Sequence, residues 1–133
     1  MKIAVTAKSN NLESEIDPRF GRCSFFIIVD PDVMDFESIS NESAMSSGGA
    51  GIQAAQTVAK AGVEVVITGN MGPNAFQTLS AAGIMVFTGA NGTVKEAIDK
   101  YKRGELKKTE SASVGSHFGM RGADRGFGRG REI

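Results

Sequence analysis

The chain of 133 residues holds one cysteine, no tryptophan and no excess of either charge, since 15 Lys and Arg residues balance 15 Asp and Glu residues. A single cysteine, Cys23, cannot form a disulfide within the chain, which fits a reducing compartment. A net charge of zero gives no overall field that would attract nucleic acid or a membrane surface. The N-terminus carries no signal-like apolar region, and no run reaches the roughly 20 apolar residues of a membrane span. We therefore expect a soluble, cytoplasmic protein with no membrane or nucleic-acid partner.

Catalytic signatures are missing as well. The first strand-like segment, residues 2–7, holds no carboxylate, whereas a two-metal nuclease needs acidic residues to hold its ions. The glycine-rich stretches lack the Lys-Ser/Thr pair of a phosphate-binding P-loop, and no nucleophile turn between a strand and a helix is present. The sequence therefore favours a binding protein over an enzyme.

Apolar periodicity divides the first 106 residues into strands and helices. Near-continuous apolar runs predict four buried strands, at 2–7, 23–30, 63–68 and 84–88. A weaker alternation at 34–40 predicts a half-exposed edge strand. Helical spacing predicts three helices, which begin near residues 51, 73 and 93. Pro73 suits a first helical position, and Thr93 with Glu96 forms a capping box. The order β-β-β-α-β-α-β-α indicates one α/β domain.

The connections between these elements predict where a ligand would bind. Short links make the first three strands an antiparallel meander, while strands that follow helices are expected to run parallel to the first. The loops 8–22, 41–50 and 69–73 then leave the sheet at one edge, where open α/β sheets bind ligands. Two of these loops lead into helix N-termini, which attract anions, and Arg19 and Arg22 add positive charge. The sequence thus predicts an electropositive rim.

Four short motifs in this arrangement resemble those of a known family. They are Asp17-Pro18-Arg19-Phe20-Gly21-Arg22-Cys23, Gly48-Gly49-Ala50-Gly51, Gly69-Asn70-Met71-Gly72-Pro73 and Gly92-Thr93-Val94. They make residues 1–106 similar to the dinitrogenase iron-molybdenum cofactor biosynthesis family, the nitrogenase accessory factors. The resemblance implies a three-layer α/β/α, ribonuclease-H-like fold with a mixed five-stranded sheet in the order 3-2-1-4-5, whose second strand is antiparallel. It also implies a non-enzymatic carrier of an iron–sulfur or iron–molybdenum cluster, with cluster donor and acceptor proteins as partners.

The residues expected to bind the cofactor lie in three loops: Arg19, Phe20, Gly21, Arg22, Cys23, Gly48, Gly49, Gly51, Asn70, Met71 and Gly72. Many relatives carry a histidine where this chain has Arg19, and arginine cannot ligate iron. Cys23 is a candidate thiolate ligand, and its alternative role is that of a small core residue. One thiol is fewer than the four that usually hold a cluster, so a bound cluster would be labile, shared between subunits or held largely by charge. The alternative role of the arginines is a salt bridge to Asp17 or Glu15.

Residues 107–133 form the remaining segment. From Ser111 onward, glycine and arginine recur with few apolar residues, so we expect a disordered tail. His117 lies there in a Ser-His-Phe-Gly run and is either a substitute metal ligand or part of a chance tripeptide. The tail also supports an alternative function, a small adaptor or anion- or phosphate-binding protein whose Gly/Arg tail recruits a partner. The expected oligomeric state is a monomer or weak dimer.

Overall fold

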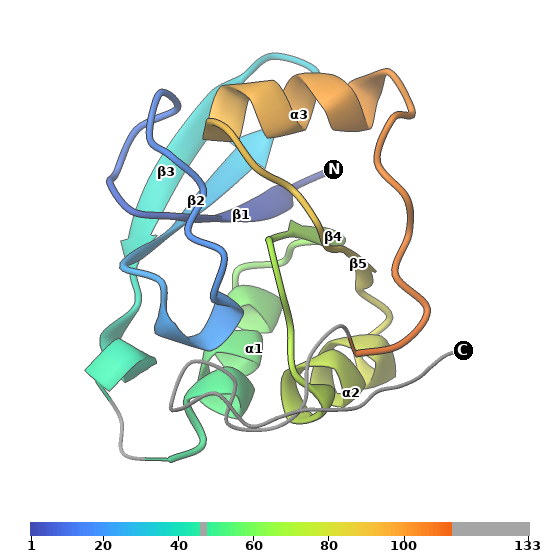
Figure 1. Cartoon of the computed structure of the whole chain (residues 1–133). Helices are drawn as coiled ribbons and strands as arrows, with labels where there is room; N and C mark the ends of the chain where they lie inside the picture. The colour runs from blue at the N-terminus through green and yellow to red at the C-terminus, as the bar shows by residue number, and fades with distance from the viewer. Residues whose placement is uncertain (46–47, 113–133) are drawn as a thin grey trace.

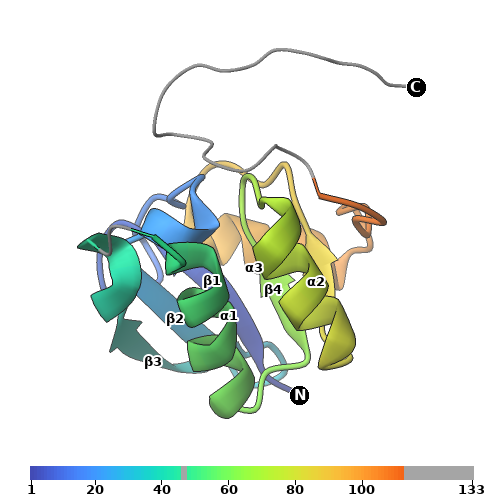
Figure 2. The same cartoon turned by 90° about the horizontal axis from the view of Figure 1, so that it is seen from below.

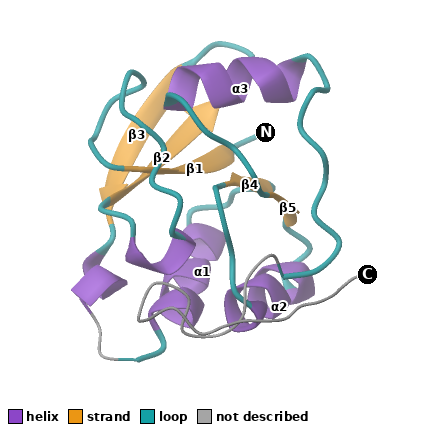
Figure 3. Ribbon diagram, viewed as in Figure 1, coloured by secondary structure: helices purple, strands orange, loops and turns teal. Residues whose placement is uncertain are grey.

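The computed structural model describes residues 1–45 and 48–112. A five-stranded sheet in the order β3-β2-β1-β4-β5 lies between two layers of helices (Figures 1 and 3). The strands and α-helices are β1 (Ile3–Ala7), β2 (Phe25–Asp30), β3 (Asp35–Ser40), α1 (Ala50–Lys60), β4 (Val65–Ile67), α2 (Pro73–Ala81), β5 (Met85–Phe87) and α3 (Val94–Lys102). Two short 3-10 helices are η1 (Phe20–Arg22) and η2 (Glu42–Met45). The three-layer α/β/α architecture is confirmed.

The pairing of the strands follows the lengths of their connections. β2 pairs antiparallel with both β1 and β3, because the links between these strands are too short for a crossover helix. β1 and β4, and then β4 and β5, pair in parallel and are separated along the chain by helices. β2 therefore runs opposite to the other four strands, as predicted.

Each face of the sheet contributes its own apolar core, because successive residues of a strand point to opposite faces. The core beneath α1 and α2 includes Phe26, Ile28, Val66, Val86, Ala54, Val58 and Leu79. The core beneath α3 includes Val5, Ile27, Ile67, Phe87, Val94 and Ile98. Figure 2 shows η1 and the starts of α1 and α2 at the same end of the sheet. No helix within the described ranges has the length and apolar character to span a bilayer.

The chain stays associated with the sheet beyond residue 106, where the tail was expected to begin. Thr109 donates its N–H to the Val86 carbonyl oxygen at 2.8 Å, and its hydroxyl accepts the Thr88 N–H at 2.9 Å. The segment around Thr109 thus covers part of the outer edge of β5. The expectations for His117 and for residues 113–133 lie outside the described residues.

Candidate functional site

The first and third glycine-bearing loops meet beyond the carboxyl ends of β1 and β4. Asn70 donates its N–H to the Pro18 carbonyl oxygen at 2.7 Å, and Arg19 and Asn70 form a short parallel bridge. A methyl group on Gly69 would lie 2.6 Å from Pro18 Cα, well inside ordinary contact distance. Glycine is therefore required here to let the two backbones touch.

Two threonines fix Asp17 of the first loop to the strand ends. The Thr6 hydroxyl, near the end of β1, donates to the Asp17 carbonyl oxygen at 2.6 Å. The hydroxyls of Thr6 and Thr68 lie 2.8 Å apart, and both side chains are buried. Because buried polar groups are costly to leave without hydrogen bonds, this pair ties the loop to the sheet.

The first loop also contacts the second loop, where α1 begins. A methyl group on Gly21 would lie 2.9 Å from the Gly51 backbone nitrogen. On its other side, Gly51 packs so tightly that its own methyl group would lie 3.3 Å from Ala75 Cβ in α2. The loops around residues 17–23, 48–51 and 69–72 therefore form one continuous surface, which we call the rim.

Two helices point their N-termini at the rim without a side-chain cap. Gly49 and Gly72 occupy the N-cap positions of α1 and α2, and neither helix has a side-chain cap hydrogen bond. Gly49 adopts a left-handed conformation with φ of 72°, which suits glycine. On the opposite face of the sheet, α3 is closed by the reciprocal capping box of Thr93 and Glu96. The positive ends of two helix dipoles therefore lie at the rim, and no N-cap side chain bonds to the first-turn N–H groups, of which Pro73 at the start of α2 contributes none.

The two arginines of the rim have different roles. Arg19 is about half exposed, and its Nε lies 3.4 Å from Oδ1 of the buried Asp17. Asp17 Oδ1 also accepts the Arg19 N–H at 3.0 Å, so this carboxylate braces the turn. Arg22 donates from Nη1 to the Ala44 carbonyl oxygen at 2.9 Å and so holds η2 against the first loop. The half-exposed guanidinium of Arg19 thus supplies accessible charge beside its ion pair with Asp17. Arg22, by contrast, braces the loop.

The structure brings the predicted residues together but exposes only some of them. Arg19, Gly48 and Gly49 are exposed, while Gly21, Arg22, Gly51, Asn70 and Gly72 are half-buried. Phe20, Cys23 and Met71 are buried in the core beneath α1 and α2. These three residues therefore support the rim from below.

The Cys23 thiol has surroundings that disfavour its ionisation. The side chain is fully buried, and burial together with the negative charge of Asp17 raises the pKa of the thiol to about 12. The thiol donates to the Phe20 carbonyl oxygen at 3.3 Å. A metal ligand needs the thiolate, so this geometry favours the alternative role of Cys23 as a core residue.

Asn41 is an important residue that the sequence analysis did not single out. It follows the last residue of β3, is buried, and its side-chain amide donates to the carbonyl oxygens of Gly21 at 3.2 Å and Cys23 at 2.9 Å. Together with Arg22, it braces the first loop against the segment that leads to α1. A polar residue between an edge strand and a glycine loop was the only signal in the sequence, and that signal is common to many turns.

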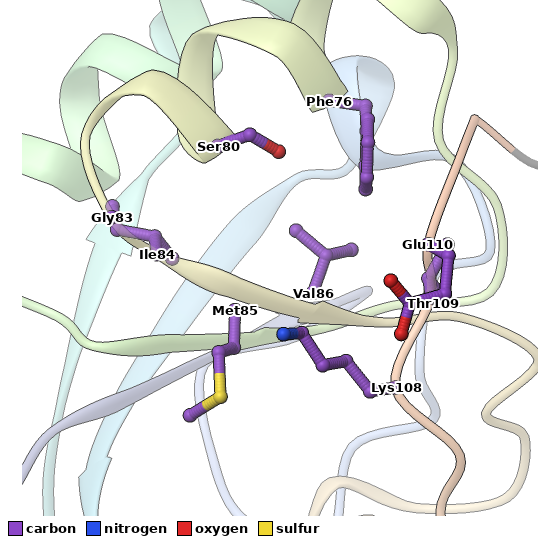
Figure 4. A pocket seen from close by; sticks show the side chains of 9 residues that line it. All are labelled: Phe76, Ser80, Gly83, Ile84, Met85, Val86, Lys108, Thr109 and Glu110. Atoms are coloured by element: carbon purple, nitrogen blue, oxygen red, sulfur yellow. The ribbon is translucent and has the colours of Figure 1, made fainter.

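The residues that the structure describes hold no set of metal ligands, and one pocket that they form lies away from the rim. Within 1–45 and 48–112, no three His, Cys, Asp or Glu side chains are grouped to hold a metal ion. A pocket of about 300 Å³ lies instead between α2 and the edge of β5, where Figure 4 shows Phe76 facing Val86. Its lining residues are Phe76, Ser80, Gly83, Ile84, Met85, Val86, Lys108, Thr109 and Glu110. None of the predicted site residues lines this pocket.

Comparison with known proteins relates the chain to a known family. Residues 1–104 match the family model described as dinitrogenase iron-molybdenum cofactor. An uncharacterized protein of Methanocaldococcus jannaschii is 33% identical over 113 residues, a match that covers 83% of this chain and 92% of that protein.

Solved structures agree in fold with this chain over nearly their whole length. The apo form of the orange protein from Desulfovibrio gigas is 42% identical with a TM-score of 0.83, and the match covers 85% of this chain and 96% of that one. A proposed NifB protein from Thermotoga is 35% identical with a TM-score of 0.72, covering 85% and 98%.

Proposed function

The chain belongs to the dinitrogenase iron-molybdenum cofactor family, and we propose that it is a non-enzymatic carrier of an iron–sulfur or iron–molybdenum cluster or its precursor. The cluster is the cargo, and it binds at the rim. The observation that carries the proposal is the convergence of two helix N-termini without side-chain caps beside Arg19. The expected partners are the proteins that donate and accept the cluster, in the cytoplasm.

The chemistry of the rim suits a cluster with negative charge. Sulfide and thiolate sulfurs accept hydrogen bonds from N–H groups, and such bonds and the net charge help to set the properties of a bound cluster. α1 and α2 contain 11 and 9 residues, long enough for each to present an N-terminal dipole. The Gly49 and Gly72 positions carry no side chain that would keep a bulky anion from these N–H groups.

Retention by charge and hydrogen bonds also fits a carrier. The Cys23 side chain is fully buried and its thiol donates to the Phe20 carbonyl oxygen, so a covalent iron–thiolate bond is not part of the proposal. A cluster held without such bonds can leave the rim without first breaking them. The rim would then protect a cluster in transit and release it to a partner.

The same geometry supports a second candidate function, the binding of phosphate or another small oxyanion. Helix N-termini bind phosphate through the same N–H groups that would face a cluster. Size and charge distribution separate the two, since a cluster spans both helix starts, whereas a phosphate ion needs only one. Competition between the two anions therefore tests which one the rim prefers.

A pair of substitutions at Gly49 tests the proposed site. Asp and Asn both tolerate the left-handed conformation and have nearly the same shape, so Gly49→Asp and Gly49→Asn differ mainly in charge. The probe is a synthetic thiolate-ligated [4Fe–4S] cluster, added anaerobically and followed by absorbance and by amide chemical shifts. The Asp variant should bind about two- to fivefold more weakly than the Asn variant, because a carboxylate competes for the helix N-terminus.

Controls separate the rim from the rest of the surface. Lys60→Gln removes a charge at the opposite end of α1 and should leave the affinity unchanged, whereas Arg19→Gln should lower it. Equal binding by the two Gly49 variants would contradict the proposed site. Displacement of the cluster by equimolar inorganic phosphate would favour the second candidate function.

A further inference from the structure

The two edges of the sheet are protected differently. At β5, Thr109 occupies the outward Val86 carbonyl oxygen and the Thr88 N–H, so the chain covers part of this edge with its own backbone. β3 forms the other edge and lies at the outer side of the sheet (Figure 1). An uncovered edge offers a row of backbone donors and acceptors to another chain.

The backbone groups of β3 that face outward can be identified from its pairing with β2. Asn41 donates its N–H to the Ser24 carbonyl oxygen at 2.9 Å, which places Asn41 among the residues that bond toward β2. Inward and outward bonding alternates along an antiparallel strand, so Phe36, Ser38 and Ser40 direct their N–H and C=O groups away from the sheet. No residue in the described part of the chain bonds to these backbone groups.

The side chains of this edge are accessible and partly apolar. Five of the six residues of β3 are exposed. Phe36 is 43% exposed, and Val33 in the preceding turn is 64% exposed. A strand that added to this edge would bury apolar surface as well as backbone groups.

The charged residues in this stretch of the chain are of one sign. Residues 23–59 contain no lysine or arginine, and their acidic residues are Asp30, Asp32, Asp35, Glu37 and Glu42. Asp30 and Asp35 lie directly opposite each other in the β2–β3 pair, an arrangement that destabilises a sheet. None of the ion pairs formed within the described residues includes these carboxylates. The fold thus carries a like-charge pair that a cationic partner would relieve.

We propose that the outer edge of β3 receives an extended, basic segment of a partner protein as an added strand. The backbone of Phe36, Ser38 and Ser40 supplies the hydrogen bonds, and Asp35 and Glu37 select positive side chains. A second copy of this chain is a poorer occupant, because pairing would bring two acidic hairpins together. Since Asn41 joins the end of β3 to the first rim loop, the docked partner lies beside the rim. The idea that cargo is transferred to the docked partner rests on the proposed function, whereas the docking itself does not.

The test uses the full chain and a capped nine-residue peptide that alternates valine and arginine. Amide hydrogen exchange and chemical shifts report on the residues that the peptide covers. Exchange at Phe36, Ser38 and Ser40 should slow at least about tenfold at saturation, whereas the β5 edge should be unaffected. A peptide with glutamate in place of arginine, and one with a central proline, serve as ligand controls.

Two variants test the two parts of the proposed interaction. Ser38→Pro removes an N–H group that faces outward, and an edge strand tolerates proline at such a position. The variant should weaken peptide binding at least about fivefold. Asp35→Asn with Glu37→Gln should weaken binding about threefold or more at low salt and remove most of its salt dependence. Glu64→Gln with Glu110→Gln makes the same charge change elsewhere and should have no effect.

Several results would overturn the proposal. One is an unchanged exchange rate at β3 with saturating peptide, and another is equal binding of the arginine and glutamate peptides. If exchange at β3 is slow in the absence of peptide, and slows further as the protein concentration rises, the edge would be assigned to a second copy of this chain. Slow exchange at every concentration would assign it to this chain's own C-terminal segment. If the peptide still docks at β3 while the Gly49 variants give no evidence for a binding site at the rim, this inference stands apart from the proposed function.

Discussion

Replacing Gly69 by alanine should destabilise the fold more than replacing Gly21, and replacing Gly48 should have almost no effect. The new methyl group would lie 2.6 Å from Pro18 Cα in the first variant and 2.9 Å from the Gly51 nitrogen in the second. Favourable carbon contacts lie at about 3.5–4.0 Å, so the backbones would have to separate by roughly 0.5–1 Å. Neither glycine has a positive φ, so the contact alone accounts for the strain.

The magnitudes follow from the cost of overpacking. We expect Gly69→Ala to lower the free energy of unfolding by about 3 kcal/mol and Gly21→Ala by about 1–2 kcal/mol. Among the described residues, a methyl group on Gly48 would meet no atom within 4 Å, so Gly48→Ala is the matched control and should stay within about 0.5 kcal/mol of the original chain.

The assay is urea unfolding followed by far-ultraviolet circular dichroism, because the chain contains no tryptophan for fluorescence. The difference in stability comes from the transition midpoints, provided that the slopes agree. A Gly48 variant as unstable as the Gly21 variant, or an unaffected Gly69 variant, would refute the convergence of the three loops.

Two further predictions concern the residues beneath the rim. In the folded protein the pKa of the Cys23 thiol is raised from 9.0 to about 12. Between these two values the thiol ionises only in the unfolded chain, so the free energy of unfolding falls as pH rises through this window. The loss is at most about 1.4 kcal/mol per pH unit and should be absent in Cys23→Ala, as urea midpoints from pH 8 to 10.5 would show. Asn41→Ala leaves the Gly21 and Cys23 carbonyl oxygens without this donor and should cost about 1–3 kcal/mol, whereas the exposed Asn74→Ala should not.

Much of the fold could be predicted because its signals are local in the sequence. The capping box is an example, since the Thr93 hydroxyl accepts the Glu96 N–H at 3.1 Å and the Glu96 carboxylate accepts the Thr93 N–H at 2.8 Å. Strand ends were predicted less well. Cys23 and Val63 are buried but lie outside the strands, because apolar character reports burial and not membership of a hydrogen-bonded ladder.

The candidate site also has features that the sequence predicts and features that it does not. Strand direction places the three loops at one edge, so their convergence follows from connection lengths and sequence order. The role of each side chain does not follow from them, because it depends on contacts between segments that are distant in the sequence. Arg22 reaches the Ala44 carbonyl oxygen, and Asn41 reaches back to Gly21 and Cys23. Such partners are fixed only when the loops are packed, and no spacing rule predicts them.

The ligand contacts proposed for the rim come mainly from backbone groups, and this would determine which changes the rim tolerates. Its glycines allow close backbone contact, while Asn41 and Arg22 brace the loops. Anion affinity should therefore depend more on the spacing of the two helix starts than on the identity of any one exposed side chain. By the same reasoning, replacement of Arg19 should weaken anion binding without abolishing it, provided that glycine remains where Gly21 and Gly69 allow the loops to touch.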